Sequence, residues 1–256
     1  MDFLAAKWAE FTLWAVGVWE NFCRQFYSAF IEDNRWTYIT TGLQNTLIVT
    51  FFALLLGVVL GVVVALLRST WDQSIRHRPK SFSRGVFRFV NGLCKVYLTV
   101  IRGTPVVVQI MIIFFVIMAS SQNKILAGVI AFGINSGAYV AEIVRGGIMS
   151  IDPGQMEAGR SLGFGYVPTM RYIVLPQAFK NVLPALANEF IVLLKETAVA
   201  GYVGLTDLTR GAGIIRGLTY QSFLPLIAVA LIYLVMVIFF TWLVGKLERR
   251  LSSNVR

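Results

Sequence analysis

Polar side chains recur on one face of a predicted apolar helix near the middle of the chain. Asn135, Tyr139 and Glu142 are four and then three residues apart, a spacing that places them on one helix face. Ionisable groups at membrane depth cost about 2.5–3.5 kcal/mol to insert, so they usually face the protein interior and serve a function. Two other apolar segments carry polar residues, Gln109, Glu196 and Thr197. We expect these residues to line a ligand-binding cavity, where carboxylates receive an ammonium group and amides pair with a carboxylate.

The charged residues of these segments also have structural explanations, and Lys195 and Glu196 could each pair with a neighbouring span. Arg145 follows Glu142 by three residues, and an ion pair within the helix is favoured there over ligand contact. Glu189 lies near the end of its segment, where an interaction with a loop is expected. Glu196 is the best single candidate for ligand binding, because it should lie deeper and opens a segment, 197–204, whose glycines weaken a helix.

Patterns that would support catalysis are missing from the sequence. It lacks the G-x-x-x-x-G-K-[ST] phosphate-binding loop, so any ATP must be bound by another subunit. The single histidine, His77, lies in a basic stretch, and no cluster of Cys and His suggests a metal site. The Ser and Thr residues lack a credible base within the membrane. We therefore expect neither an enzyme nor a cofactor or metal bound by this chain.

Membrane-spanning helices are predicted to position the polar residues. Hydrophobic residues make up 57% of the 256-residue chain and charged residues 14%, whereas soluble domains carry roughly 25% charged residues. A spanning helix needs about 20 mostly apolar residues. The apolar runs predict an all-α, polytopic membrane protein with five spans, at about 43–67, 104–119, 125–146, 182–203 and 224–245. In the third span, glycines are expected to permit close helix packing rather than to contact ligand, at positions 128, 133, 137, 146 and 147.

The distribution of Lys and Arg predicts the orientation, because these residues mark the cytoplasmic ends of spans. Sixteen fall on one side: Arg68, Arg76, Arg78, Lys80, Arg84, Arg88, Lys95, Arg102, Arg145, Arg160, Arg171, Lys180, Lys246, Arg249, Arg250 and Arg256. Six fall on the other side: Lys7, Arg24, Arg35, Lys124, Arg210 and Arg216. The N-terminus is therefore predicted outside and the C-terminus in the cytoplasm. Because the basic residues flank spans instead of forming one stripe, nucleic-acid binding is disfavoured.

The first 35 residues form a separate segment in this prediction. Charged residues interrupt any signal-peptide core, and no small-residue cleavage site follows. Large apolar residues recur at roughly helical spacing, at Phe3, Leu4, Trp8, Phe11, Leu13, Trp14, Val18, Phe22, Phe26 and Phe30. An amphipathic helix on the outer membrane surface and a helix packed on the spans explain this pattern equally well. The two predicted parts are thus residues 1–35 and 36–256.

The segment 157–176, EAGRSLGFGYVPTMRYIVLP, interrupts the apolar spans and cannot lie in hydrocarbon. Asp152 as a cap and Pro153 in the first turn are expected to begin a short helix that ends near residue 162. Two glycines then stop it, and a second short helix is predicted from Pro168 to Pro176. Such a helix pair could be a rigid handle for a partner or an ordinary amphipathic connector lying on the bilayer.

The start of the second span has a local explanation. Thr104 can cap the helix and Pro105 suits its first position. Arg102 would then lie at the cytoplasmic boundary, where its side chain can extend toward water. A capped helix start explains these residues at least as well as ligand contact does.

The interrupting segment resembles the EAA loop of ABC-transporter permeases, whose pattern is Glu-Ala-Ala, three residues, Gly, nine residues, Ile-x-Leu-Pro. Six positions match the pattern: Glu157, Ala158, Gly163, Ile173, Leu175 and Pro176. Gly159 stands where a second Ala is usual, which weakens the helix but keeps its surface small. The resemblance implies that these residues form an ATPase-coupling loop, at about 148–178.

Further segments between residues 36 and 247 resemble the polar amino-acid permeases of this family, of the histidine, glutamine and arginine type. Arg102 to Pro105 is similar to their RGTP motif, and the stretch 135–148, NSGAYVAEIVRGGI, to their third span. Residues 194–197, LKET, resemble their LKDT segment, with Glu196 in place of Asp. Ala198 stands where Ser is frequent.

The resemblance implies the permease subunit of an ATP-driven importer for polar amino acids, with a type I ABC importer permease fold, in a bacterial plasma membrane. It also implies a second permease chain, identical or related, two ATPase subunits that hold ATP and Mg²⁺, and an external amino-acid-binding protein. The alternative is an ion-coupled secondary transporter that uses Glu142 or Glu196 as a proton site. The short chain and the absence of a visible inverted repeat disfavour it. A purely structural membrane subunit is the third possibility.

Overall fold

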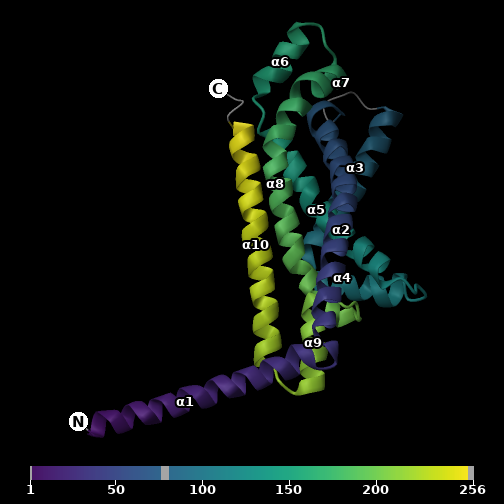
Figure 1. The fold of residues 1–256 in the computed structure, drawn as a ribbon. Coiled ribbons are helices and arrows are strands. Elements are labelled where there is room, and N and C mark those ends of the chain that lie inside the picture. The colour runs from purple at the N-terminus through teal and green to yellow at the C-terminus, as the bar shows by residue number, and fades with distance from the viewer. Residues whose placement is uncertain (1, 76–80, 253–256) are drawn as a thin grey trace.

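The computed structural model describes residues 2–75 and 81–252, so His77 lies outside the described residues. The described chain is built from helices and turns and contains no strand (Figure 1). Its α-helices are α1 (Asp2–Phe26), α2 (Trp36–Thr70), α3 (Phe82–Gly103), α4 (Val106–Ile112), α5 (Lys124–Met149), α6 (Pro153–Ser161), α7 (Tyr166–Thr169), α8 (Leu175–Glu196), α9 (Leu208–Thr219) and α10 (Phe223–Ser252). Short π-helical and 3₁₀ turns continue several of them.

Close packing of α2 against α5 organises the bundle. Buried small residues recur along α2, and a side chain added at Gly61 would lie 2.5 Å from Val140 of α5. At Gly57 an added Cβ would approach Ser136 to 3.1 Å. Glycine is therefore required where the two backbones approach each other. The predicted packing role of the third-span glycines is confirmed at positions 128, 133, 137 and 147, whereas an added Cβ at Gly146 would meet nothing within 4 Å.

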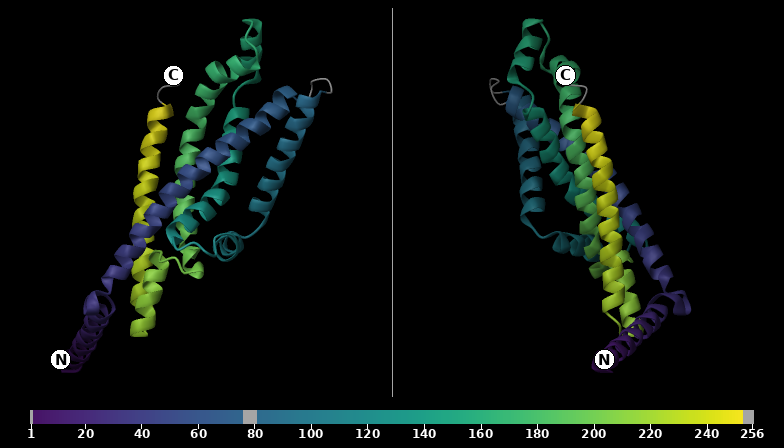
Figure 2. Two further views of the ribbon diagram at one scale, coloured as in Figure 1. Left: turned by 90° about the vertical axis from the view of Figure 1, so that its right-hand side faces the viewer. Right: turned by 60° about the vertical axis from the view of Figure 1, so that its left-hand side comes forward.

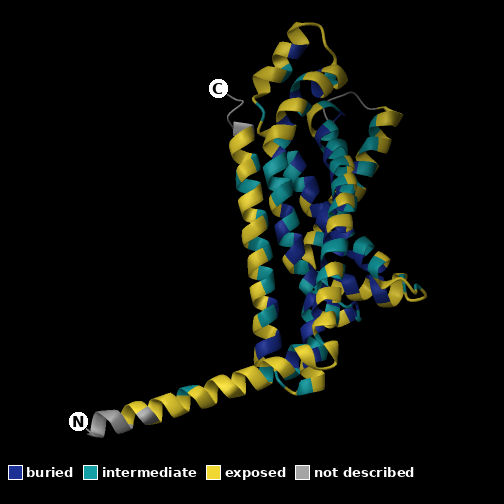
Figure 3. Cartoon of the chain, in the orientation of Figure 1, coloured by how far each residue is buried: buried dark blue, intermediate teal, exposed yellow. Residues whose placement is uncertain are grey.

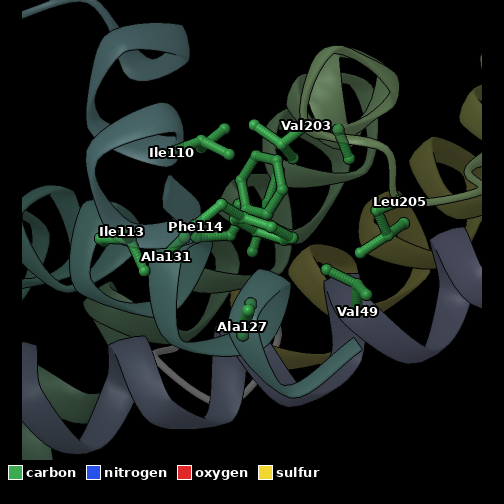
Figure 4. Close-up of a cluster of buried hydrophobic side chains, with 12 residues drawn as sticks. Val49, Ile110, Ile113, Phe114, Ala127, Ala131, Val203 and Leu205 are labelled. Atoms are coloured by element: carbon green, nitrogen blue, oxygen red, sulfur yellow. The ribbon is translucent and has the colours of Figure 1, made fainter. Parts of the chain in front are cut away.

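One buried apolar cluster joins elements from four parts of the chain. Figure 4 shows Val49 of α2, Ile110 of α4, Ile113 and Phe114 of the turn after α4, Ala131 of α5, and Leu205 in this cluster. These elements are far apart in sequence, so burial of their side chains holds α4 against α5 and the segment after α8.

Among the described residues, three helices are long and apolar enough to cross a membrane: the α2 rod Trp36–Ile75, α5, and Phe223–Arg250 of α10. The pair Phe82–Gly103 and Val106–Ile117 passes the same test together but is bent by 112°, which raises the number to four. The predicted spans 43–67, 125–146 and 224–245 thus lie within single helices. The fourth predicted span begins within α8, which carries four charged residues and does not pass the test: Lys180, Glu189, Lys195 and Glu196.

The predicted second span, 104–119, is wrong in its bounds. The preceding residues, which we expected to form a cytoplasmic loop, are largely the helix α3. The apolar residues Val106–Ile117 follow α3 after a sharp bend. Thr104 and Pro105 are extended rather than helical. The Thr104 hydroxyl donates to the carbonyl of Val100 at 2.8 Å, so it closes the end of α3 instead of capping α4. Arg102 consequently lies at the end of α3 opposite Phe82, not at the start of a helix.

The distortion predicted after Glu196 is confirmed. α8 ends at Glu196, and Thr197–Val203 forms a tighter 3₁₀ helix. Gly204 follows with φ of 80°, a left-handed conformation that glycine adopts without steric cost. The fourth predicted span, 182–203, therefore consists of most of α8 and this 3₁₀ helix.

The two termini lie at opposite ends of the bundle (Figure 1). The end of α10 lies with α6 and α7, whereas α1 and α9 lie at the other end, and the views of Figure 2 agree. α1 extends away from the bundle, and the surface that it presents is almost entirely exposed (Figure 3). In this structure α1 is therefore not packed along the spans of its own chain.

Candidate functional site

The loop between α5 and α8 folds as a helix pair at the tip of the molecule (Figure 1). The Asp152 carboxylate accepts from the Gly154 amide at 2.8 Å and Pro153 opens α6, as predicted. Gly163, with φ of 81°, then reverses the chain. The second helix differs from the prediction: it runs without a non-helical break from α7 through Met170–Val174 into α8, so Pro176 lies in the first turn of α8 and ends nothing.

Gly159 holds the two helices of this loop together. It is buried, and an added Cβ would lie 2.5 Å from Cγ2 and 2.7 Å from Oγ1 of Thr169, which is itself fully buried. The hydroxyl of Thr169 donates to the Gly165 carbonyl at 2.9 Å and cannot easily turn away. The departure from the Glu-Ala-Ala pattern is thus explained by contact with Thr169.

The outer surface of the loop is accessible to a partner. Glu157 and Ala158 are exposed on α6, as are Gly163 and Pro176, whereas Ile173 and Leu175 are half-buried. Large apolar side chains nearby are also exposed: Leu162 at 74%, Val167 at 70% and Tyr172 at 66%. Exposed apolar side chains among polar ones are often found on surfaces that contact another protein.

A second polar region surrounds Glu142 within the bundle. Its carboxylate lies 3.6 Å from Arg68, 3.9 Å from Arg102 and 3.4 Å from Arg145. The predicted ion pair with Arg145 is therefore confirmed, but it is one of three. Arg102 also lies over the ring of Tyr139, 5.8 Å from its centre.

Tyr139 and Glu142 line a cavity of about 640 Å³ together with cationic residues of α2 and α3: Arg68, Lys95 and Arg102. Three cations face one carboxylate, so the cavity is electropositive. An electropositive cavity favours an anionic group, and the carboxylate of Glu142 is occupied by its three ion pairs.

Gln109 and Asn135 meet, but they are buried and bonded to each other. The Asn135 amide donates to the Gln109 carbonyl at 2.9 Å. The Gln109 amide donates in turn to the carbonyls of Ile101, at 2.7 Å, and Thr104, at 2.9 Å. These carbonyls lose their helical partners at the bend, so Gln109 satisfies them. Neither residue lines the cavity beside Glu142.

Glu196 and Thr197 belong to a different place again. Thr197 is buried and its hydroxyl donates to the Leu194 carbonyl at 2.7 Å, which closes the end of α8. Glu196 is half-buried and does not line the cavity beside Glu142. Glu189, expected to contact a loop, is instead buried in the bundle, where it accepts from the Ser136 hydroxyl of α5 at 2.8 Å.

Sequence reasoning did not identify the three cations of the cavity, Arg68, Lys95 and Arg102, as site residues. It counted Arg68 and Lys95 only as markers of membrane orientation, and for Arg102 it gave no preference to ligand contact over a position at the membrane boundary. A usable signal was present, because Arg88, Lys95 and Arg102 are seven residues apart and share one face of a helix.

Comparison with known proteins agrees with this arrangement. Residues 81–253 match the family described as binding-protein-dependent transport system inner membrane component. The arginine transport system permease protein ArtQ of Bacillus subtilis (strain 168) is 38% identical over 220 residues, covering 85% of this chain and 94% of that protein. The glutamine transport system permease protein GlnP of Escherichia coli (strain K12) is 41% identical over 167 residues, covering 63% of this chain and 76% of that protein.

Solved structures show the same fold. A crystal structure of an amino acid ABC transporter with histidines superposes with a TM-score of 0.74 at 42% identity, covering 86% of this chain and 98% of that one. An inward-facing structure of the MetNI methionine ABC transporter superposes with a TM-score of 0.71 at 19% identity, covering 86% and 99%. The chain therefore belongs to the binding-protein-dependent transport system inner membrane component family and is a permease subunit of an ABC importer.

Proposed function

We propose that this chain forms the translocation pathway of an importer for polar amino acids, driven by ATP and Mg²⁺ on partner ATPase subunits. Its relatives are described as arginine and glutamine permeases, and one structural neighbour is an amino acid transporter. Residues 36–256 make up the permease domain, which pairs with a second permease chain, identical or related. An extracytoplasmic amino-acid-binding protein delivers the cargo.

The observation that carries the proposal is the exposed helix pair at the tip of the molecule, with the spacing of the EAA loop. Through it, the ATPase subunits pull on α5 and α8, which the loop joins directly. Glu157, Ala158 and the apolar residues beside them form the contact surface, and Gly159 and Gly163 give the pair its shape. Ile173, Leu175 and Pro176 lie where the loop continues into α8 without a non-helical break. Movement of the loop is therefore transmitted directly to α8.

For the cargo, the cavity beside Glu142 supplies the contacts. Arg68, Lys95 and Arg102 attract the carboxylate that every amino acid carries, and Tyr139 lies against it. Glu196 does not line this cavity; at the distorted end of α8 its carboxylate receives an ammonium group at a separate point of the pathway, and Thr197 closes the helix beside it. Gln109 and Asn135 support the site by holding the α3–α4 bend rather than by touching cargo.

In the membrane, we place the α6–α7 end in the cytoplasm, because most Lys and Arg residues flank that end. α8 with the following 3₁₀ helix completes the five spans, as the fourth in chain order. Glu189 is buried and Glu196 half-buried in this helix, which packs against α2, α5 and α10. Residues 1–35 form the interfacial segment. Exposed Trp8, Trp14 and Trp19 along α1 suit the outer membrane–water boundary, where tryptophan is enriched.

The test is uptake into proteoliposomes that contain the chain with its ATPase and binding protein. We expect uptake of a polar amino acid that requires ATP, and deletion of residues 152–165 should abolish both uptake and co-purification of the ATPase. Retained ATPase binding after this deletion would refute the coupling role. Uptake by the chain alone, driven by an ion gradient, would instead show a secondary transporter.

A further inference from the structure

An apolar groove runs along the outer side of the bundle between α2, α8 and α10. Its volume is about 650 Å³, and its walls include Leu54 of α2, Ala187 and Phe190 of α8, and Phe240 of α10. The rings of Phe190 and Phe240 meet edge to face, with centres 4.8 Å apart, which shapes one wall. The groove and the polar cavity beside Glu142 share no lining residue, so they are separate sites.

Two cations close one end of this groove. Lys246 and Arg250 both line it, and they are four residues apart on one face of α10. The ammonium of Lys246 lies 4.2 Å from the ring centre of Trp242, so the side chain is held along the helix. This end of α10 is the one beside α6 and α7 (Figure 1).

The groove is thus amphipathic along its length, with an apolar trough that ends at two positive charges. We propose that it holds one anionic phospholipid of the cytoplasmic leaflet. The acyl chains lie against Phe190 and Phe240, and Lys246 and Arg250 bind the phosphate of the headgroup. The leaflet assigned to this lipid rests on the proposed orientation of the permease.

Charge complementarity selects this occupant. The cytoplasmic leaflet is negative, and each Lys or Arg near its surface contributes about 1 kcal/mol of attraction. The cations also lie in the last turns of α10, where the helix dipole favours positive charge. A zwitterionic lipid would use the apolar walls equally well but would gain less from the two cations.

The test is retention of lipid by the purified importer complex, measured by native mass spectrometry. Wild-type complex is exchanged into detergent with phosphatidylglycerol or with phosphatidylcholine. We expect wild type to retain phosphatidylglycerol preferentially, and the double variant Lys246→Gln/Arg250→Gln to bind it about 30-fold more weakly, the fold-change for two cations at about 1 kcal/mol each. The matched control, Lys180→Gln/Arg249→Gln, removes equal charge at the same end but outside the groove lining, and should retain the lipid.

Filling the trough provides a second, independent variant. Ala187→Trp should exclude the lipid, whereas Ala230→Trp, on an exposed position of α10, should not. Thermal unfolding of each complex shows whether the variants fold.

Three results would overturn the proposal. These are equal retention of the two lipids by wild type, equal retention by the two double variants, or a loss of permease pairing in Ala187→Trp with lipid retention unchanged. The last result would assign the groove to the second permease chain. Deletion of residues 152–165 should leave lipid retention intact, so this inference and the coupling role fail separately.

Discussion

The loop between α5 and α8, which we propose couples to the ATPase, and the charged cluster around Glu142 hold their residues in place by different means. In the loop, Asp152, Pro153 and Gly163 act on backbone within a few residues of themselves. In the cluster, Glu142 of α5 is held by Arg68 of α2 and Arg102 of α3, which only the folded bundle brings together. A substitution in the loop should therefore weaken the coupling of transport to ATP hydrolysis and leave the helix bundle folded. A substitution in the cluster should instead lower the stability of the bundle.

The largest effect is expected from Glu142→Gln. Without the carboxylate, the three surrounding guanidinium groups repel one another, and their side chains are only 16–46% exposed. After allowance for solvent screening, we expect a loss of about 2–3 kcal/mol in the free energy of unfolding. Thermal unfolding of the purified complex measures it. Glu157→Gln, on the exposed face of α6, is the control and should leave the midpoint unchanged while reducing ATPase coupling. Equal thermal-unfolding midpoints for the two variants would show that the cluster around Glu142 stabilises the bundle no more than the loop does.

Gly159→Ala should show that the loop also contains one tertiary contact. The added methyl group would press on the buried Thr169 side chain, so we expect about 1–2 kcal/mol of local destabilisation and several-fold weaker ATPase co-purification. Adding Thr169→Ala removes the two atoms nearest to the new methyl and should restore much of the binding. If the Gly159→Ala variant binds the ATPase as well as wild type does, the close contact between positions 159 and 169 is not required for ATPase binding.

A smaller effect is expected at the turn of the loop. Gly163 has positive φ, so Gly163→Ala should cost about 1 kcal/mol and lower the coupling efficiency, measured as the ratio of transport to ATP hydrolysis. Gly165 lies two residues on with φ of −73°, and Gly165→Ala should be nearly neutral. Similar losses from both substitutions would point to side-chain crowding rather than backbone strain.

The smallest effect is the coupling between Gln109 and Asn135. A double-mutant cycle with Gln109→Leu and Asn135→Leu should give an interaction of about 0.6 kcal/mol, the average for hydrogen bonds between membrane helices. Unfolding of the complex in mild detergent provides the four free energies. A strictly additive double variant would mean that the bond between the two amides does not stabilise the bend.

Much of the fold could be predicted because its signals are local. Uncharged runs located α2, α5 and α10, the pair Asp152 and Pro153 located the start of α6, and glycines located the distortion after Glu196. The motif spacing pointed to the family. Each of these signals acts within one or two helical turns, so it can be recognised without knowing the neighbours in space.

Other features required the tertiary structure. The apolar run 104–119 looked like a straight span, because hydropathy does not report a bend that Thr104 and Gln109 stabilise through the end of α3. The electropositive cavity was hidden because its cations lie on different helices from Tyr139 and Glu142.

By itself, the sequence determined most of the apolar helices, where the loop between α5 and α8 begins and turns, and to which family the chain belongs, but it did not reveal the helix α3. The tertiary structure alone decided which polar groups meet. A helix advances by about 100° per residue, so the partners of Glu142 or Gln109 depend on the rotation and bending of whole helices, which are set by packing at glycine contacts far along the chain.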